Sequence, residues 1–382
     1  MDIRPSGNSI EVTNSSFLKW RSPSRPPMPR SGLGLSNDSI RLNANESPYG
    51  PIPEVQQRMV AACSRVNRYP DVAATALRNS LGQHLGIPPS QIIVGSGSSE
   101  FIHMLTVAFG GEGAEVVVPT PSFPMYSVSV SYTKATLVSV PINADDGTVD
   151  LIAMYKAITD RTSLIFLCNP NNPTGGQISL AKVKAFLQRV PDHVAIALDE
   201  AYWELTDAFI DGVETSLALC EQFPNLIILR TFSKFYGLAG LRVGYAIVHN
   251  EEIATRLGSI RVPTMPNTIG LEAALACVEF HQFYLQRARD VVVERTRVLQ
   301  IVKSLGYEPF PSQTNFYCMP FPLGIDPFVK MGIQVRGGDT IQMKDYVRIS
   351  LGTMDENNLA LEVLRKHATS VTSWSSGEGG TK

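Results

Sequence analysis

Short apolar segments alternate with longer amphipathic segments along most of the chain between residues 91 and 261. The short segments are rich in Val, Ile and Leu and have the length of buried strands, whereas the longer ones repeat apolar residues at helical spacing. Strands are predicted at 91–94, 115–118, 136–140, 163–167, 194–198, 226–229 and 243–248. Helices are predicted between several of them, at 100–109, 151–159, 180–190 and 251–261.

Continuous apolar strands that alternate with helices are typical of an α/β fold with a mostly parallel sheet covered by helices on both faces. Beyond residue 265 the pattern changes to a long helical stretch at 268–304, strand-like segments at 316–320 and 346–351, and a helix at 358–367. This second pattern predicts a smaller α+β domain. Parallel sheets bind ligands at the carboxyl ends of their strands, so residues that follow the predicted strands are the candidates for a site.

The two ends of the chain differ from the rest. Residues 1–38 are rich in Ser, Pro and Gly and carry little periodicity, which predicts a flexible N-terminal arm. Residues 369–382 (TSVTSWSSGEGGTK) are low in complexity, which predicts a disordered tail.

Composition narrows the class of protein. The chain has 382 residues and a formal net charge of −2, without the basic surplus that a nucleic-acid-binding surface needs. Its five cysteines and six histidines are scattered, so neither a disulfide framework nor a metal site is predicted. No apolar run approaches the roughly 18 residues of a membrane span, and the N-terminus lacks the apolar core of a secretory signal. These features predict a cytoplasmic enzyme with no membrane or nucleic-acid partner.

Residues 95–100 (GSGSSE) follow the first predicted strand and open the first predicted helix. Glycines permit a tight turn, and free N–H groups at a helix N-terminus can receive a phosphate. The segment matches neither GxGxxG nor GxxxxGK[ST], which argues against a domain that uses a dinucleotide or ATP. A structural helix cap is the alternative for this segment taken alone.

Two polar side chains follow neighbouring predicted strands. Asn172 lies in NPNNPTG, where two X-Pro steps and a glycine make a rigid turn that lets its amide donate to a phenolate oxygen. Asp199 follows its strand directly, and a buried carboxylate needs a partner such as a protonated pyridine nitrogen. A plain turn at Asn172 and an ion pair of Asp199 with a local Arg or Lys are the alternatives.

Lys234 follows the predicted strand 226–229 in TFSKFYGLAGLRVGY. A buried lysine can stay partly neutral and form a Schiff base with an aldehyde, although a lone lysine more often extends to solvent. Ser233 and Arg242 are suited to phosphate oxygens. Phe123 can stack on a planar cofactor or serve as a core aromatic. A lysine, an aspartate, an asparagine, a tyrosine and an arginine are the parts needed to hold pyridoxal phosphate (PLP), and this chain offers Lys234, Asp199, Asn172, Tyr202 and Arg242.

Six ordered motifs resemble those of the fold-type-I PLP enzymes, the aspartate-aminotransferase superfamily, and most closely its histidinol-phosphate aminotransferase branch. The similarity covers roughly residues 41–367. The motifs are RLNANESPYGP (41–51), NRYPD (67–71), NPNNPTG (169–175), DEAY (199–202), SKFYGLAGLRVGY (233–245) and VRISLGT (347–353). The resemblance implies a large PLP-binding domain at 61–265 and a small domain formed by 39–60 and 266–368.

The resemblance also implies a role for each residue of the cofactor site. Lys234 is expected to form the Schiff base and to move a proton between the substrate Cα and C4' of PLP. Asp199 is expected to pair with the pyridine nitrogen, while Asn172 and Tyr202 hydrogen-bond its O3'. Phe123 is expected to stack on the ring. The phosphate is expected to be held by Ser98, Ser99, Ser233 and Arg242.

On the substrate side, Arg348 matches the arginine that forks onto a substrate α-carboxylate. Arg336 matches a second arginine, which can receive a phosphate or a carboxylate. Asn45 and Asn315 are implied to lie near the substrate. Tyr69 resembles the residue that reaches the phosphate of the neighbouring subunit, which implies a homodimer with shared sites.

The N-terminal region departs from the branch. Relatives usually have a Leu-x-Pro-Tyr segment ahead of LNANE, whose Tyr helps to bind the substrate phosphate. This chain has PMPR at 27–30 and no Tyr before Tyr49. The prediction is thus a complete cofactor site with an altered side-chain pocket.

The function predicted is a PLP-dependent aminotransferase of a biosynthetic pathway. It would move an amino group between an amino acid or amino-phosphate donor, histidinol-phosphate-like, and a 2-oxo acid. A decarboxylase or a cyclising or eliminating enzyme on the same scaffold is an alternative, because the fold does not decide which Cα bond breaks. A non-catalytic PLP-binding sensor and a nucleotide-binding α/β domain are two further alternatives.

Overall fold

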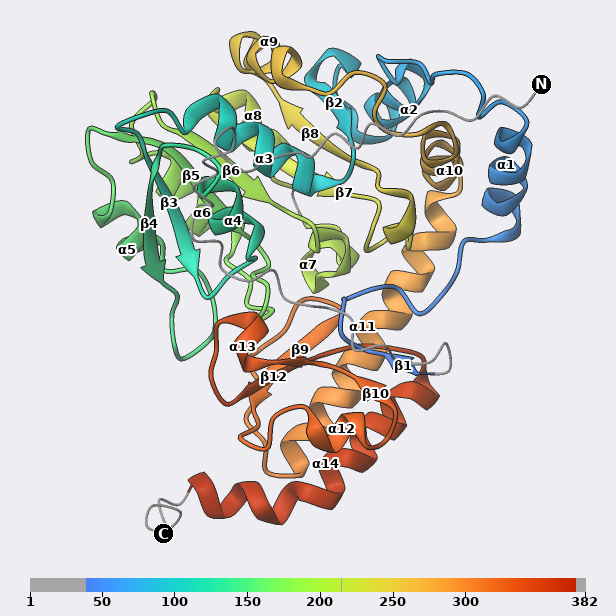
Figure 1. The fold of residues 1–382 in the computed structure, drawn as a ribbon, viewed down its shortest axis with the longest axis vertical. Coiled ribbons are helices and arrows are strands. Elements are labelled where there is room, and N and C mark those ends of the chain that lie inside the picture. Colours follow the sequence, from blue (N-terminus) through green and yellow to red (C-terminus); the bar gives the residue numbers. More distant parts are fainter. Residues whose placement is uncertain (1–38, 214, 376–382) are drawn as a thin grey trace, which may run out of the picture.

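The computed structural model describes residues 39–213 and 215–375, with the backbone alone at 369–375. The predicted arm at 1–38 and the end of the predicted tail, 376–382, lie outside the described residues. The described chain forms two lobes, a large one built on a twisted sheet and a smaller one below it in Figure 1, joined by the long helix α11 (His281–Ser304).

The boundaries of the elements follow the predicted pattern closely in the large lobe. The strands are β1 (Ile40–Arg41), β2 (Ile92–Gly95), β3 (Glu115–Thr120), β4 (Thr136–Pro141), β5 (Thr162–Cys168), β6 (Ala195–Asp199), β7 (Leu226–Thr231), β8 (Gly244–Val248), β9 (Phe316–Pro320), β10 (Ile333–Gln334), β11 (Arg336–Gly337) and β12 (Tyr346–Ser350). The other α-helices are α1 (Pro53–Cys63), α2 (Thr75–Leu85), α3 (Ser98–Phe109), α4 (Met125–Val130), α5 (Leu151–Lys156), α6 (Leu180–Leu187), α7 (Asp207–Ile210), α8 (Leu217–Gln222), α9 (Glu251–Ile260), α10 (Thr268–Glu279), α12 (Asp326–Val329), α13 (Gly338–Ile341) and α14 (Met354–Ser375). Three 3₁₀ turns are η1 (Pro89–Gln91), η2 (Trp203–Leu205) and η3 (Ala239–Leu241).

The large sheet has the strand order β2-β8-β7-β6-β5-β3-β4. Strands β3 to β7 pair in parallel, whereas β8 pairs antiparallel with both β7 and β2. The predicted mostly parallel sheet is therefore confirmed. The antiparallel β8 returns the chain along the sheet, so its first residues lie at the same edge as the last residues of β7.

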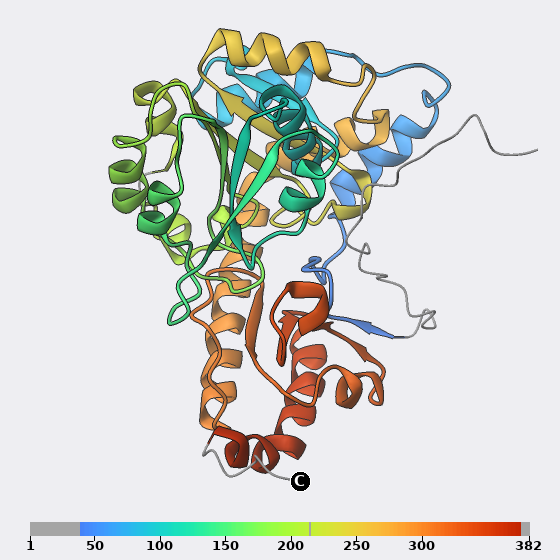
Figure 2. The same cartoon turned by 60° about the vertical axis from the view of Figure 1, so that its left-hand side comes forward.

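Alternate residues of the strands face opposite sides of the sheet, as the period of two requires. On β5, Ile165 and Leu167 pack into one core with α2, α6 and α10, while Leu164 and Phe166 pack into a second core with α3, α4 and α9. Figure 2 shows helices on both sides of the sheet. Both faces are dry, which explains why the strands are almost continuously apolar.

The small lobe is built on the antiparallel sheet β11-β12-β9 and the parallel pair β1-β10. Helix α14 and the second half of α11 cover it, and Val298, Leu361 and Leu364 lie in its core. Residues Ile40 and Arg41, far away in the sequence, complete this lobe by pairing with β10. The predicted α+β character is confirmed.

Three predicted boundaries are corrected by the packing. The helical stretch 268–304 is two helices, because Phe280 leaves helical geometry at φ −99° and ψ 26°. Helix α10 and residues Ile52 and Val55 pack in the same core as the large sheet, whereas the predicted boundaries at 60/61 and 265/266 assign them to the small domain. Helix α14 continues to Ser375, which moves the start of the predicted tail at 369 by more than a turn. The pattern of one helix does not reveal which sheet the helix covers.

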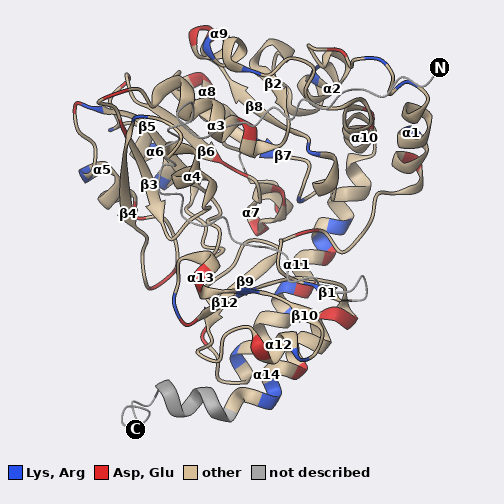
Figure 3. Ribbon diagram, viewed as in Figure 1, with Lys and Arg blue, Asp and Glu red and all other residues tan. Residues whose placement is uncertain are grey.

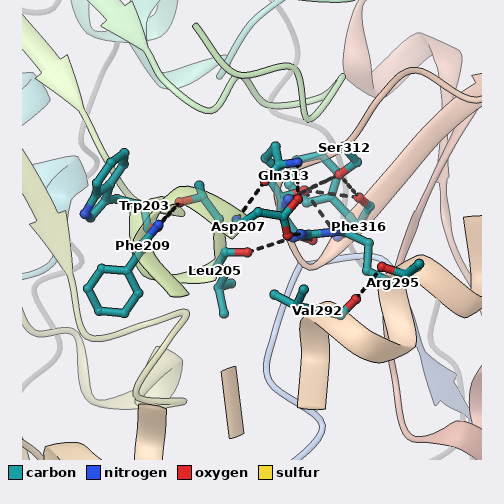
Figure 4. Close-up of polar contacts among 12 residues, drawn as sticks. Trp203, Leu205, Asp207, Phe209, Val292, Arg295, Ser312, Gln313 and Phe316 are labelled. Atoms are coloured by element: carbon teal, nitrogen blue, oxygen red, sulfur yellow. Dashed lines mark hydrogen bonds and ion pairs between the residues drawn. The ribbon is translucent and has the colours of Figure 1, made fainter. Parts of the chain in front are cut away.

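A polar network joins the two lobes where α11 leaves the large one (Figure 4). The buried Arg295 donates to the carbonyl oxygen of Leu205 at 2.7 Å and pairs with Asp207. Asp207 is also bound by Gln313, whose Nε2 donates to its carboxylate at 2.7 Å. These contacts fix the segment before β9 against the loop that follows β6.

Charged side chains of both signs are spread over the helices and loops (Figure 3). Within the described part of the chain, no helix is both long enough and apolar enough to cross a membrane.

One buried ion pair lies on the sheet face opposite to α4. Arg230 on β7 donates through Nε and Nη2 to Glu200 Oε2 at 3.0 and 2.8 Å, and the two side chains are 3% and 0% exposed. Burial raises the pKa of the neighbouring Glu204 to about 7, with Arg230 acting in the opposite direction. Arg230 therefore compensates acidic groups that the core could not otherwise hold.

We expect Arg230→Met to lower the free energy of unfolding by about 3 kcal/mol, because Glu200 is then a buried carboxylate without a partner. The double variant Arg230→Met/Glu200→Gln should lose less than the single variant. Lys134→Met, which breaks an ion pair with side chains 75% and 80% exposed, should cost less than about 1 kcal/mol. Urea unfolding of the three variants measures this. Equal losses of unfolding free energy in the single and double variants would contradict the role of Arg230 as the partner of Glu200.

Candidate active site

A cavity of about 430 Å³ lies at the carboxyl ends of the parallel strands, and strands β11 and β12 of the small lobe contribute to its wall. All predicted site residues except Tyr69 and Asn315 line it: Asn45, Ser98, Ser99, Phe123, Asn172, Asp199, Tyr202, Ser233, Lys234, Arg242, Arg336 and Arg348. The large sheet and the small lobe thus bring together residues from Asn45 to Arg348.

One end of the cavity gathers hydrogen-bond donors. Helix α3 begins there after Gly97, and no side chain caps its N-terminus. Gly97 has a φ of +79°, and a Cβ on it would lie 2.5 Å from Nη2 of Arg242. Arg242 itself donates to the Ser233 hydroxyl at 3.3 Å. Free helix N–H groups beside a guanidinium make an anion site, which agrees with the predicted phosphate position.

Lys234 is held against the segment that follows β1. Its Nζ donates to the carbonyl oxygens of Ala44 and Asn45 at 3.0 and 2.8 Å. Burial lowers the pKa of Lys234 to about 7, and the positive charge of Arg348 acts in the same direction. A large share of this amine is therefore neutral near pH 7, as nucleophilic attack on an aldehyde requires.

Asp199 ends β6 and is 2% exposed. Its Oδ2 accepts a hydrogen bond from the Tyr126 hydroxyl at 2.9 Å, and its Oδ1 accepts one from the Ala201 N–H at 3.1 Å. Burial raises the pKa of Asp199 to about 6, while the hydrogen bond from Tyr126 lowers it. The predicted alternative of an ion pair with a local Arg or Lys does not occur among the described residues, where no salt bridge includes Asp199.

Asn172 and Tyr202 line the same cavity, and each is oriented by a neighbour. Asn172 accepts from Nη1 of Arg348 at 2.6 Å through its Oδ1, which leaves its amide N–H groups free to donate. The Tyr202 hydroxyl accepts from Nδ2 of Asn45 at 3.0 Å, which leaves its own proton free to donate. Two donors are thus available for one phenolate oxygen.

Asn45 connects the two lobes at this point. It has a positive φ of 53°, and its backbone N–H and its Oδ1 both bond to the Ser350 hydroxyl of β12, at 2.8 and 2.9 Å. Left-handed backbone is costly for most residues, and Asn tolerates it better than most. Asn45 is therefore a junction between β12 and Tyr202.

Arg336 and Arg348 face each other across β11 and β12 in the antiparallel register. Arg336 donates from Nε to the carbonyl oxygen of Asn43 at 2.9 Å, and Arg348 donates from Nη2 to the same oxygen at 2.7 Å. Nε of Arg348 is buried without a partner, and no salt bridge among the described residues includes either guanidinium. Like charges opposite each other on a sheet are unfavourable without an anion between them, so this pair is a candidate anion site.

Two predicted site residues do not line the cavity. Asn315 donates to the carbonyl oxygens of Asn45 and Glu46 at 3.2 and 3.4 Å, so it supports the cavity wall from behind. Tyr69 is 85% exposed and lies by a separate groove between the loop after α1 and helix α10. It does not reach the cavity of its own chain.

Sequence reasoning missed other residues of the site. Tyr126 contacts Asp199 directly, yet in PTPSFPMY it has the pattern of a core aromatic; its spacing of three from Phe123 is the only available signal. Met125, Val128 and Ile341 give the cavity an apolar side, and Ile341 comes from the small lobe. No local pattern predicts that α13 approaches α4.

The residues present fit PLP. Asp199 is a buried carboxylate that lacks the cation that a protonated pyridine nitrogen would provide. Lys234, Asn172 with Tyr202, and the Gly97–Arg242 end offer an amine, two donors to a phenolate and an anion site. Phe123 lies in the cavity wall and is available to a planar ring.

Comparison with known proteins agrees with this geometry. A family model described as aminotransferase class I and II matches residues 37–364. An aromatic amino acid aminotransferase of Mycobacteroides abscessus is 40% identical over 328 residues, which cover 86% of this chain and 92% of the relative. A histidinol-phosphate aminotransferase of Geobacillus thermodenitrificans is 37% identical over 335 residues, which cover 87% of this chain and 90% of the relative.

A solved structure supports the fold. The histidinol-phosphate aminotransferase of Sinorhizobium meliloti, in complex with pyridoxal-5'-phosphate, has a TM-score of 0.78 and 29% identity to this chain. The match covers 87% of this chain and 91% of that one.

The neutral state of Lys234 can be measured in the cofactor-free protein. Its labelling by an amine-specific acylating reagent should reach half its plateau near pH 7, because burial favours the reactive neutral amine. In Arg348→Met the half-point should move to higher pH, because a nearby positive charge is lost. Peptide mass spectrometry across a pH series gives both values, with the exposed Lys134 as an internal reference for the reagent. A half-point close to the ordinary 10.5 would show that the amine is hydrated.

Proposed function

The chain belongs to the family of class I and II aminotransferases, and from that premise we propose that it transfers an amino group from an amino donor to a 2-oxo acid with pyridoxal 5'-phosphate as its cofactor. The predicted family resemblance and the enzyme class are confirmed. The observation that carries the proposal is the placement of a buried amine, Lys234, and an uncompensated buried carboxylate, Asp199, in one cavity.

PLP, when bound, supplies an aldehyde that joins the donor nitrogen and a protonated ring that accepts electrons from the Cα–H bond. Lys234 would take the proton from the donor Cα and return it to C4', because its amine lines the cavity and burial lowers its pKa to about 7. Asp199 keeps the ring nitrogen protonated. Asn172 and Tyr202 donate to the phenolate oxygen, while Arg242, Ser233 and the N-terminus of α3 hold the phosphate.

The donor we favour is an aromatic amino acid. Arg348 forks onto its α-carboxylate, and its buried Nε, which has no partner in the described chain, gives it a free donor for this purpose. Met125, Val128 and Ile341 offer an apolar surface to the donor side chain. The relative from Mycobacteroides abscessus is named for this donor class.

Histidinol phosphate is a second candidate donor, and the opposed guanidiniums of Arg336 and Arg348 favour it. Two cations that take part in no ion pair within the described residues suit a doubly charged phosphate better than a single carboxylate. Two of the compared proteins are named for that substrate.

We also propose that the protein is a homodimer in which Tyr69 completes the phosphate site of the partner. Two apolar side chains within three residues of Tyr69 in the sequence are exposed, Val66 (58%) and Val72 (49%). The groove beside Tyr69 has a volume of about 300 Å³, which is enough space for side chains of the partner subunit. Asp71 fixes the loop by accepting from the N–H groups of Ala73 and Thr75.

Donor identity can be tested by incubating the PLP-loaded protein with one donor at a time and no 2-oxo acid. Mass spectrometry should show conversion of the cofactor to pyridoxamine phosphate by phenylalanine or tyrosine. Lys234→Ala should abolish this conversion, because no other amine replaces the proton carrier.

If histidinol phosphate alone converts the cofactor to pyridoxamine phosphate, and Arg336→Met loses this conversion, histidinol phosphate is the donor. If a donor disappears while the cofactor stays as PLP, a decarboxylase or a cyclising or eliminating enzyme replaces the proposed activity.

For the dimer, sedimentation velocity should give twice the mass of the chain, and Tyr69→Phe should weaken PLP binding by about ten-fold, since a hydrogen bond to a charged group is lost. Tyr132→Phe is the matched control, because Tyr132 is also exposed (46%) but packs against His103. A monomer that binds PLP tightly would overturn this part of the proposal.

A further inference from the structure

The carboxylate of Asp199 has a fixed hydrogen-bond partner that does not belong to the predicted cofactor site. The Tyr126 hydroxyl donates to Oδ2 at 2.9 Å, and the backbone N–H of Ala201 donates to Oδ1 at 3.1 Å. Each oxygen thus has one donor from the described chain, and each keeps a further lone pair for a ligand. Tyr126 is the only side chain that donates to Asp199 among the described residues.

Tyr126 has no freedom to turn its hydroxyl elsewhere. It lies on α4 and is 1% exposed. Its ring stacks on Phe166 of β5, with centroids 4.7 Å apart and an interplanar angle of 16°. Phe123 packs edge-on against it at 5.8 Å. A side chain held on two sides by aromatic rings keeps one rotamer, so its hydroxyl is preorganised toward Asp199.

In this pair Tyr126 is the hydrogen-bond donor and Asp199 is the acceptor. Burial, followed by the charge of Asp199, raises the pKa of Tyr126 well above its ordinary value, so Tyr126 remains a donor. The hydrogen bond from Tyr126 opposes the burial that raises the pKa of Asp199. A donor to the charged form of a carboxylate favours ionisation.

We propose that Tyr126 is a positioning residue that keeps the Asp199 carboxylate ionised and aimed at the ring nitrogen of the cofactor. The inference rests on the proposed function, because it assigns Asp199 to that nitrogen. Phe123 then faces the cofactor ring directly. Tyr126, three residues later on the same segment, acts on the ring through Asp199. Tyr126 touches neither the substrate nor the cofactor in this role.

The test compares the affinity of the cofactor-free protein for PLP and for 1-deaza-PLP, in which a C–H group replaces the ring nitrogen. Tyr126→Phe should weaken PLP binding by about ten-fold, the value for one hydrogen bond to a charged group. Binding of the deaza analogue should be unchanged, because it offers Asp199 no N–H. A purely structural role of Tyr126 would weaken both ligands equally, and that result would overturn the proposal.

Two controls separate folding from positioning. Tyr307→Phe removes a buried hydroxyl that donates to Leu364 O at 2.9 Å in the small lobe, and it should leave both affinities unchanged. In an Asp199→Asn background, Tyr126→Phe should have no further effect on PLP binding, because the carboxylate that Tyr126 acts on is gone. An undiminished loss in that background would also overturn the proposal.

The same measurements distinguish a failure of the proposed function from a failure of the role assigned to Tyr126. Wild-type protein that binds neither ligand would contradict the proposed cofactor, and with it the premise of the inference. Wild-type protein that binds PLP, with a Tyr126→Phe variant that binds it equally well, would leave the proposed function intact and would remove only the role of Tyr126.

Discussion

The parallel pairing of β5, β6 and β7 is the constraint from which the active site follows. Its hydrogen-bond ladder sets Cys168, Asp199 and Leu229 level with one another, so the chain leaves all three strands at the same edge. The turn with Asn172, the DEAY segment and the segment with Lys234 therefore begin side by side. The antiparallel β8 pairs Gly244 with Thr231, which returns Arg242 to the same edge. Strand β2 pairs Gly95 with Gly244 and brings the start of α3 there as well.

The same register separates two neighbouring carboxylates that differ in function. Asp199 and Glu200 are consecutive, and their side chains lie on opposite faces of the sheet. Glu200 receives both Nε and Nη2 of Arg230 and is a compensated structural charge. From the described residues, Asp199 receives only a phenol O–H and a backbone N–H. A buried charge without a countercharge is expensive to maintain, and this cost is characteristic of a site that gains its partner from a ligand.

The small lobe contributes charge rather than shape alone. Arg336 and Arg348 enter the cavity from paired strands, and Arg348 orients Asn172 through a hydrogen bond across the lobes. Asn45 connects Ser350 of the small lobe to Tyr202 and Lys234 of the large one. A movement of the small lobe would therefore shift residues of the cofactor site and of the substrate site together. The Arg295–Asp207 pair fixes the other side of the junction.

The sequence by itself determined the α/β class and the seven strands of the large sheet, because these depend on local patterns. It also pointed to most of the polar residues that line the cavity, but to few of the apolar ones. Apolar runs of strand length and polar residues directly after them, such as Asp199 and Lys234, are visible in the chain. Only the tertiary structure decided that α10 covers the large sheet, that Asn315 stands behind Asn45, and that Tyr126 turns its hydroxyl to Asp199. These depend on contacts between segments far apart in the sequence and on the face to which a side chain points. A buried tyrosine has the same pattern whether its hydroxyl meets a carboxylate or a carbonyl, and only packing decides between them.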